Sequence, residues 1–204
     1  MQIVKEGYLF ILVPFSLGLI LFIMGLGGLA YIIGVLCVLF SLFCLYFFRD
    51  PKIEITKGDN LIISPCNGTV LEVSESETEK IVRVFLSVLD VHLQRSPIFG
   101  KVVSVEHKSG KFLKADNPQA HIVNEQNIIT IENENGRYVV KQIAGVLARR
   151  CVCWVKQGDI VNMGDKIGLI KFGSQVDLHM HKNVKIKVGS GNKVVSGVTI
   201  IATL

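Results

Sequence analysis

The dipeptide Gly173-Ser174 is the place where the order of residue types permits an unusual reaction of the backbone. Glycine has no Cβ, so Gly173 reaches conformations that are strained for other residues. A serine directly after it can turn its hydroxyl onto the Gly173 carbonyl, and with help from a base the peptide rearranges to an ester. Elimination and hydrolysis then leave a pyruvoyl group on a new chain that begins at position 174. The dipeptide is also an ordinary turn pair, so the rest of the chain must decide between the two interpretations.

A second group of polar residues follows the valine-rich segment 81–89, which we expect to be a strand. In an extended backbone every second side chain points to the same side, so Asp90, His92 and Gln94 would share one face. An imidazole near a carboxylate at the end of a buried strand suits proton transfer. An exposed strand end would give the same pattern, and periodicity alone leaves both open.

Other polar residues give weaker signals. His107 and His121 lie in or beside the polar stretch 108–126, and we interpret both as solvated side chains of a long surface or active-site loop. The pair Arg149 and Arg150 could bind a phosphate or a carboxylate.

The elements that must position these residues are predicted to be strands. From residue 53 onward, short apolar runs alternate with turn signals, and Asn67-Gly68 and Asn133-Glu134-Asn135-Gly136 each predict a hairpin. Two valine-glycine units, residues 155–168 and 188–200, form a weak internal repeat of the type found in the small sandwiches that carry biotin or lipoate. We therefore predict a mainly β fold, a barrel or sandwich with lipoyl-like repeats, with one half on each side of Gly173-Ser174.

The same repeat raises a rival function, a carrier or adaptor module on a membrane anchor. A carrier needs an exposed lysine at the tip of a hairpin. No glycine hairpin in this sequence has a methionine-lysine-methionine tip, which counts against the carrier.

The N-terminal part differs from the rest of the chain. Residues 8–48 contain no charged residue and form two apolar runs, 8–23 and 29–48, separated by glycines. A membrane span takes about 20 apolar residues. A signal peptide would instead have one short apolar core before a small-residue cleavage site. We therefore predict an uncleaved transmembrane helical hairpin.

Charges on either side of this hairpin predict its orientation. Lys5 precedes it and Arg49 follows it, which favours both ends on the cytoplasmic side. We accordingly predict two domains: residues 1–50 anchor the protein in the cell membrane, and residues 51–204 form the functional domain on the cytoplasmic side.

The cysteines and the net charge indicate which ligands and partner molecules the protein could bind. Two of the five cysteines lie in the apolar run, and Cys151 and Cys153 are closer together than the usual zinc-knuckle spacing, so we expect neither a disulfide frame nor a metal site. A formal net charge of +5 suits an anionic lipid surface. No stacking motif or basic stripe indicates nucleic-acid binding.

Taken together, these landmarks resemble the phosphatidylserine decarboxylase family in its short form, without a large helical extension. The resemblance covers almost the whole chain in the expected order. The residues that carry it are Phe47-Phe48-Arg49-Asp50-Pro51, Ser64-Pro65-Cys66-Asn67-Gly68, Asp90-Val91-His92 through Pro97, Gln142-Ile143-Ala144-Gly145 through Arg150, and Ile170 through Asp177.

The resemblance implies a proenzyme that cuts itself between Gly173 and Ser174. The products would be a large β chain, residues 1–173, and a small α chain, residues 174–204, which stay together as a heterodimer. The pyruvoyl group from Ser174 would form a Schiff base with phosphatidylserine and release CO2 to give phosphatidylethanolamine. His92 matches the family histidine that is implicated in the protonation step.

Two positions depart from the family pattern. Asn67 stands where longer members have the aspartate used in self-cleavage, and Arg95 stands where they have a second histidine. Because asparagine cannot charge-stabilise a base as a carboxylate does, cleavage is expected to be slow or to depend on His92, Asp90 and backbone strain. Two alternatives stay open: a decarboxylase of the archaeal lipid archaetidylserine, and a membrane adaptor that never matures.

Overall fold

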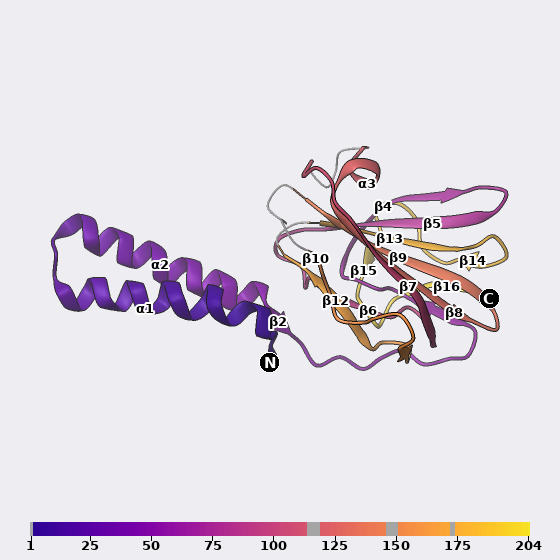
Figure 1. The fold of residues 1–204 in the computed structure, drawn as a ribbon, viewed down its shortest axis with the longest axis horizontal. Coiled ribbons are helices and arrows are strands. Elements are labelled where there is room, and N and C mark those ends of the chain that lie inside the picture. Colours follow the sequence, from indigo (N-terminus) through magenta and orange to yellow (C-terminus); the bar gives the residue numbers. More distant parts are fainter. Residues whose placement is uncertain (1, 114–118, 146–150, 172–173) are drawn as a thin grey trace. The chain divides into compact units, whose positions relative to one another are not determined.

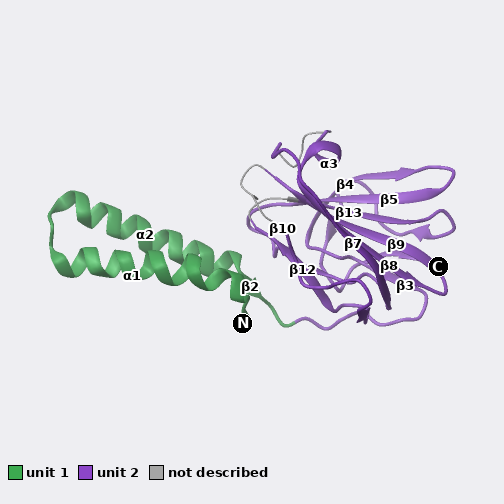
Figure 2. Cartoon of the chain, in the orientation of Figure 1, with its two compact units in different colours: residues 1–52 green, residues 53–204 purple. Residues whose placement is uncertain are grey.

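The computed structural model describes residues 2–113, 119–145, 151–171 and 174–204. These residues divide into two compact units, Met1–Lys52 and Ile53–Leu204 (Figure 2). Gly173, the predicted site of cleavage, and Arg149 and Arg150 lie outside the described residues.

The first unit is a pair of antiparallel helices closed at its base by a short strand pair. Its elements are β1 (Gln2–Ile3), the 3-10 helix η1 (Lys5–Gly7), α1 (Tyr8–Met24), α2 (Gly28–Phe47) and β2 (Arg49–Asp50). Each helix is long and apolar enough to cross a membrane, judged by length and composition. The predicted hairpin of two apolar helices is confirmed.

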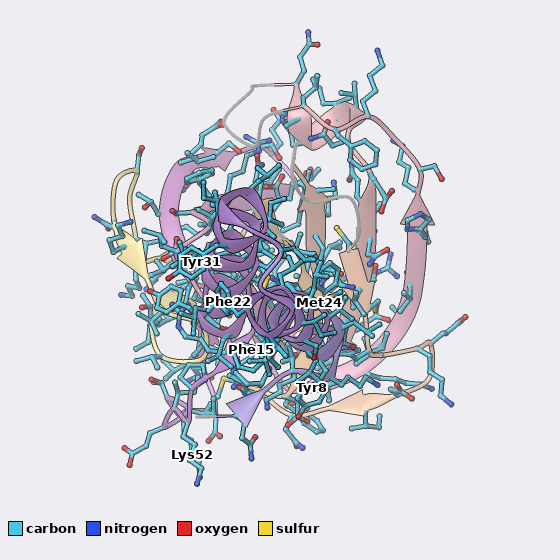
Figure 3. All side chains as sticks on the ribbon, turned by 90° about the vertical axis from the view of Figure 1, so that its left-hand side faces the viewer. Tyr8, Phe15, Phe22, Met24, Tyr31 and Lys52 are labelled. Carbon is cyan, nitrogen blue, oxygen red and sulfur yellow. The ribbon has the colours of Figure 1, made fainter. Side chains whose placement is uncertain are left out.

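Glycines shape this hairpin at its turn and at its helix–helix contact. Gly25 ends α1 with φ of 58°, in the left-handed region that glycine adopts without strain. At the contact, a Cβ on Gly18 would stand 2.8 Å from the Gly34 carbonyl oxygen, so the two helices approach closely only because both residues are small. Large apolar side chains such as Tyr8, Phe15 and Tyr31 stay exposed (Figure 3).

The second unit is built around one eight-stranded antiparallel sheet (Figure 1). In sheet order its strands are β11 (Ile160–Val161), β7 (Gly100–Lys108), β8 (Gln126–Asn133), β9 (Gly136–Ala144), β13 (Ser174–His181), β5 (Glu79–Leu86), β4 (Gly68–Glu75) and β15 (Lys193–Val194).

Two three-stranded sheets and a short helix complete the described part of this unit. One sheet has the order β10 (Cys151–Cys153), β12 (Lys166–Ile170), β6 (Leu93–Arg95), and the other has the order β14 (Lys185–Ile186), β16 (Ile200–Thr203), β3 (Leu61–Ile63). The helix α3 (Ala120–Val123) lies in the polar stretch between β7 and β8. The predicted mainly β fold is confirmed.

The apolar core of the second unit follows the period-2 alternation of its strands. On the central strand β13, the side chains of Val176, Leu178 and Met180 are buried in the core cluster. Val140 on β9 and Val84 on β5 join them from the neighbouring strands. Fully burying a side chain of this size stabilises the fold by about 1.5–3 kcal/mol.

The strand order reveals an internal duplication that extends the weak repeat seen in the sequence. One copy, which we call the inserted half, consists of β6–β12. The other, the split half, consists of β3–β5 and β13–β16 and is interrupted by the inserted half. The eight-stranded sheet is symmetric about its β9–β13 pair, with β8 matching β5, β7 matching β4 and β11 matching β15.

Hydrogen bonds repeat between the two halves. In the split half the amide of Gly191 donates to the Val70 carbonyl at 2.8 Å, and in the inserted half the amide of Gly158 donates to the Val102 carbonyl at the same distance. Both glycines have positive φ, 85° and 97°. The sequences Ser64-Pro65-Cys66-Asn67-Gly68 and Ser96-Pro97-Ile98-Phe99-Gly100 occupy matching places, just before β4 and β7.

Two local predictions are corrected by this arrangement. The hairpin predicted at Asn67-Gly68 is wrong, because β3 pairs with β16 and β4 pairs with β5 and β15. The strand predicted to continue to Leu89 ends at Leu86, and Asp90 lies in the turn that follows rather than on an extended strand face. The hairpin predicted at Asn133–Gly136 is present between β8 and β9.

Candidate active site

Ser174 is the first residue of the central strand β13. Its backbone lies opposite Leu86 on β5 and Ala144 on β9, so the strand is held on both sides from its first residue. The strand that precedes it in sequence, β12, belongs to a different sheet. The segment that contains the predicted scissile bond therefore passes from one sheet to another.

His92 is buried beside the end of β12. Its carbonyl oxygen accepts a hydrogen bond from the amide of Ile170, at 3.2 Å, four residues before Ser174 in the sequence. Its ring Nδ1 lies 2.9 Å from the carbonyl oxygen of Asp90. A carbonyl only accepts, so Nδ1 carries a proton, and in the neutral ring the basic lone pair is on Nε2.

Asp90 shapes the turn that leads to His92. Its Oδ2 accepts a hydrogen bond from the amide of Ser87 at 2.8 Å, which closes the turn after β5. The same turn has a backbone bond of 2.8 Å from the Asp90 amide to the Ser87 carbonyl. The structure therefore gives Asp90 a positioning contact with the backbone, and a side-chain bond to the His92 ring is not among the contacts it describes.

Asn67 lies on the turn before β4, and its Oδ1 accepts a hydrogen bond from the amide of Ser196 at 3.1 Å. A backbone bond of 2.8 Å from the Arg95 amide to the Pro65 carbonyl brings this turn next to β6. The turn that carries Asn67 is thereby attached to the strand that follows His92.

The pKa of the Cys66 thiol is affected by nearby carboxylates. Burial raises the pKa of the Cys66 thiol well above its ordinary value, and the carboxylates of Asp90 and Asp177 raise it further. Both carboxylates are thus close enough to Cys66 to act on it through space. Asp90, Asp177 and the turn before β4 belong to one neighbourhood.

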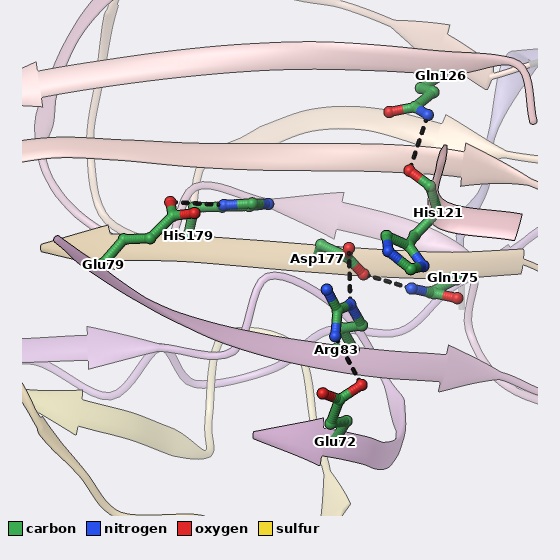
Figure 4. Close-up of polar contacts among 8 residues, drawn as sticks. All are labelled: Glu72, Glu79, Arg83, His121, Gln126, Gln175, Asp177 and His179. Atoms are coloured by element: carbon green, nitrogen blue, oxygen red, sulfur yellow. Dashed lines mark hydrogen bonds and ion pairs between the residues drawn. The ribbon is translucent and has the colours of Figure 1, made fainter. Parts of the chain in front are cut away.

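A polar cluster on β13 was not predicted as a site. Asp177 is buried, with Oδ1 accepting a hydrogen bond of 2.6 Å from Gln175 and Oδ2 lying 3.4 Å from Nε of Arg83 (Figure 4). Burial raises the pKa of the Asp177 carboxyl, and the Gln175 bond and the Arg83 charge oppose this rise. The alternation of Gln175, Asp177 and His179 along the sequence is the signal that could have identified this face.

His107 and His121, which were predicted to be solvated side chains, both make hydrogen-bond contacts. The ring Nδ1 of His107 lies 2.9 Å from Oδ1 of Asn127, although the side chain is exposed. His121 is half-buried on α3, and its carbonyl accepts a hydrogen bond of 3.0 Å from Gln126. The charge of His121 also opposes the rise in the pKa of the Asp177 carboxyl, so His121 lies near the polar cluster of β13 (Figure 4).

A cavity of about 690 Å³ lies at the other end of β9 from Ala144. Its lining includes Leu61, Ile98, Phe99 and Tyr138. Tyr138 is the third residue of β9, whereas Ala144, opposite Ser174, is the last. This cavity is therefore separate from the predicted site.

The part of the chain that the structure describes contains no candidate metal site. No group of three or more histidine, cysteine, aspartate or glutamate side chains there is arranged to hold a metal ion.

Comparison with known proteins gives consistent relatives. The family model described as phosphatidylserine decarboxylase matches residues 40–202. The phosphatidylserine decarboxylase proenzyme of Ehrlichia chaffeensis is 38% identical over 98% of this chain and 90% of the relative. Proteins of the same name are 40% identical in the Wolbachia of Brugia malayi, over 98% of this chain and 90% of the relative, and 39% identical in Beijerinckia indica, over 97% and 87%. The chain belongs to the phosphatidylserine decarboxylase family.

Proposed function

We propose that this decarboxylase is made as a proenzyme that cuts itself between Gly173 and Ser174 and then removes CO2 from phosphatidylserine to give phosphatidylethanolamine. The observation that supports this most is the near-full-length similarity to proteins named phosphatidylserine decarboxylase proenzyme, together with Ser174 of the Gly-Ser pair as the first residue of the central strand. The two products are residues 1–173 and residues 174–204.

The strand pairing supports a pair of chains that stay together after the cut. Residues 174–204 contribute β13, which is hydrogen-bonded to β5 and β9 of the large chain. They also contribute β15, which pairs with β4, and β16, which pairs with β3. Three strands of the small chain are therefore paired with four strands of the large chain, and cleavage leaves those ladders intact.

The backbone around residue 174 fits a covalent pyruvoyl group made from Ser174 itself. Such a group needs no separate binding pocket, only a new chain end that is held in place. The register of β13 against Leu86 and Ala144 supplies that hold from its first residue. When formed, a pyruvoyl group supplies a ketone that reacts with a primary amine and withdraws electrons from the bond to the carboxylate.

We assign the proton transfer of the decarboxylation to Nε2 of His92. Nδ1 is bonded to the Asp90 carbonyl, which fixes the plane of the ring and leaves Nε2 as the basic nitrogen of the neutral form. An imidazole can both accept and donate a proton, which is what the protonation step requires. Asp90 thus acts through the orientation of His92.

Asn67 is assigned no proton-transfer step. Its amide oxygen accepts the Ser196 amide, and an amide cannot take up a proton at neutral pH. In this proposal self-cleavage relies on the turn closed by Asp90 and on the conformational freedom of Gly173, and the His92→Ala variant tests whether His92 is also the base of that step.

The two apolar helices place the protein at a membrane in this proposal, with residues 1–50 as the anchor and residues 51–204 carrying the chemistry on the cytoplasmic side. Deleting residues 1–48 should release the protein from membranes, because the strands of the second unit begin after that point. Sedimentation with vesicles is the measurement. Equal sedimentation of the truncated and full chains would contradict the anchoring role.

The experiment that tests the whole proposal combines an intact-mass spectrum with a CO2-release assay on vesicles that contain phosphatidylserine labelled in the serine carboxyl. The expected result is two chains that separate at position 174 and release of labelled CO2. A single uncut chain without activity would support the non-maturing adaptor. Two chains that act only on a serine lipid with ether-linked isoprenoid tails would support the archaetidylserine alternative.

A further inference from the structure

A row of buried amide side chains connects two sheets. One is the three-stranded sheet that contains β6, the strand directly after His92, and the other is the eight-stranded sheet that contains Ser174. It runs through Gln94 on β6, Gln142 on β9 and Asn127 on β8, all three buried. Gln142 faces Val176 in the β9–β13 register, and Gln94 lies opposite Gly168 in the β6–β12 register. The row therefore spans the two sheets that lie on either side of the predicted cut.

Each bond in this row has a defined donor and acceptor. Nδ2 of Asn127 donates to Oε1 of Gln142 at 3.0 Å, and Nε2 of Gln142 donates to Oε1 of Gln94 at 2.8 Å. Nε2 of Gln94 then donates to the carbonyl oxygen of His92 at 2.7 Å. Because each amide offers NH2 in one direction and oxygen in the other, no member can be turned over without setting oxygen against oxygen.

The surroundings of Gln142 are fitted to its amide. Nε2 of Gln142 also lies 3.3 Å from the carbonyl of Val152. A Cβ on Gly168 would overlap this nitrogen, so the glycine on β12 is what admits the Gln142 side chain between the sheets. At the other end of the row, Asn127 also donates to the Cys151 carbonyl at 3.0 Å.

The row ends on the carbonyl oxygen of His92, which accepts hydrogen bonds from two strands of the three-stranded sheet, β6 and β12. The His92 carbonyl accepts from Gln94 and from the Ile170 amide, which uses both lone pairs of the oxygen. Ile170 is the last residue of β12, before the predicted cut. Once the chain is cut, the covalent link between β12 and β13 is lost, and side-chain bonds between the sheets remain to hold His92 relative to residue 174.

We propose that Gln142, acting through Gln94, is a positioning residue that fixes the peptide of His92 relative to the strand beginning at Ser174. This inference rests on the proposed role of His92 in decarboxylation. Gln142 does not exchange a proton itself. A displacement of a reacting group by about 1 Å can cost about 100-fold in rate, so loss of the row acts on turnover.

The test uses the full-length protein with Gln142→Glu and Gln142→Met, assayed for CO2 release from phosphatidylserine vesicles across a pH series. At neutral pH both variants should lose about tenfold or more in kcat with KM within about twofold of wild type. An ionised carboxylate cannot donate to Gln94, and a methionine cannot donate and is only a weak acceptor.

The pH series separates positioning from a general structural loss. A protonated carboxyl offers one O–H donor and one carbonyl acceptor, the same pair that Gln142 uses toward Gln94 and Asn127. Burial raises the pKa of a carboxyl, so the protonated form is populated at the acidic end of the series. The kcat of Gln142→Glu relative to wild type should therefore recover as the pH falls, and that of Gln142→Met should not.

Gln126 provides the matched control. It is buried on β8 beside Asn127, and its Nε2 donates to the His121 carbonyl at 3.0 Å, outside the row. Gln126→Glu and Gln126→Met should keep kcat within about twofold of wild type at every pH. If a Gln142 variant does not fold, Gln94→Met removes the last donor of the row and should give the same loss of kcat.

The outcomes divide clearly. Wild-type kcat in Gln142→Glu and Gln142→Met overturns the inference, as does a loss in Gln142→Glu that does not change with pH. The same pH pattern in Gln126→Glu also overturns it. An uncut or inactive wild-type protein overturns the proposed function, and the positioning role with it. A cut and active wild type with unaffected Gln142 variants removes the positioning role alone.

Discussion

The two halves of the β unit close the same pair of strand ends in different ways. In the inserted half, Asn133 on β8 lies opposite Gly136 on β9, and a hairpin turn joins them directly. In the split half, Leu86 on β5 lies opposite Ser174 on β13, and the entire inserted half stands between them in sequence. The proposed cut thus falls where the split half lacks the hairpin turn of its counterpart.

This difference explains how a chain end can be made there. After a cut in the β8–β9 turn, the first residues of β9 would be paired with β8 alone, because the β9–β13 ladder starts at Val139. At Ser174, the strand is already paired on both sides and the preceding strand β12 belongs to another sheet. The connections into and out of the inserted half also bring Asp90, His92 and the segment before Ser174 to this end of the sheet.

The matching positions at the other end carry different chemistry. The place of Asn67 is taken by Phe99 and that of His92 by Asn60, by the alignment of the two Ser-Pro motifs. Phe99 and Leu61 line the cavity at that end. The duplication therefore preserves the backbone pairing. Of these aligned residues, only His92, at the end of the sheet near Ser174, can transfer a proton.

The largest expected effect comes from the nucleophile. Ser174→Ala removes the hydroxyl, so the chain should remain one polypeptide of 204 residues without decarboxylase activity. Intact-mass spectrometry and the CO2-release assay measure this. Wild-type decarboxylation by Ser174→Ala would refute the assignment of the site.

The companion variant moves the dipeptide to the matching turn. Asn135→Gly with Gly136→Ser, made in the Ser174→Ala background, places Gly-Ser in the β8–β9 hairpin. The bond should stay intact, because Asn60 stands at the position that matches His92. His181→Ala is added to this variant, because the His181 ring lies 3.2 Å from the place of a Cβ on residue 136. Gly136 has φ of 131°, so the serine adds strain and a modest loss of stability is expected. Cleavage at position 136 would mean that a Gly-Ser turn alone suffices.

The next largest effect concerns the proton donor. His92→Ala should still be cut if His92 serves decarboxylation alone, and its turnover should fall by about 10² to 10⁴. Asn60→Ala, at the matching position, should leave turnover unchanged. Chain masses and kcat are measured together. An uncut His92→Ala protein would assign His92 to self-cleavage as well.

A smaller effect is expected at the turn before β4. Asn67→Asp keeps the oxygen that accepts the Ser196 amide and adds a carboxylate beside the proposed site. Cleavage should become several-fold faster, measured as the time course of chain separation after synthesis, because a carboxylate can stabilise a charged imidazole. Phe99→Asp at the matching turn is the control. An unchanged rate for Asn67→Asp would show that this chain matures without help from that position.

The smallest expected effect concerns Asp177 and is a pH-dependent change in stability. Its pKa in the folded protein is raised above the ordinary 3.8 by burial, so the folded state holds the proton more tightly than the unfolded state. This group's contribution to stability is therefore greatest below 3.8 and declines as the pH rises through the raised pKa. Asp177→Asn should remove that decline, so the Tm of the variant relative to wild type should rise as the pH increases from 3.8 through the raised pKa.

Local patterns in the sequence were sufficient for several features. Two uncharged apolar runs separated by glycines predict the helical hairpin, because length and apolarity decide whether such helices form. Asn133-Glu134-Asn135-Gly136 predicts the β8–β9 turn because the strands on either side of it pair with each other. The valine-glycine repeat predicts a duplication, since each copy uses the same turn glycines. The predicted division, with one half on each side of Gly173-Ser174, is wrong, because the split half takes β3–β5 from before the pair and β13–β16 from after Gly173.

Other features depend on partners that are distant in sequence. Asn67-Gly68 carries an equally good turn signal, yet its flanking strands pair with β16, β5 and β15, and so no hairpin forms. The row from Asn127 through Gln142 to Gln94 joins residues up to 48 positions apart, and nothing in the composition of those strands marks them as neighbours.

The sequence by itself determined the chemistry that is available: a Gly-Ser pair, a histidine and a membrane hairpin, because these depend on residue type and short spacing. Only the tertiary structure decided that β12 and the strand that begins at Ser174 belong to different sheets, that the His92 carbonyl is bonded to the end of β12, and that Asp177 is buried beside Arg83. These facts follow from long-range strand pairing and from burial, which set the orientation of a side chain and the cost of its charge.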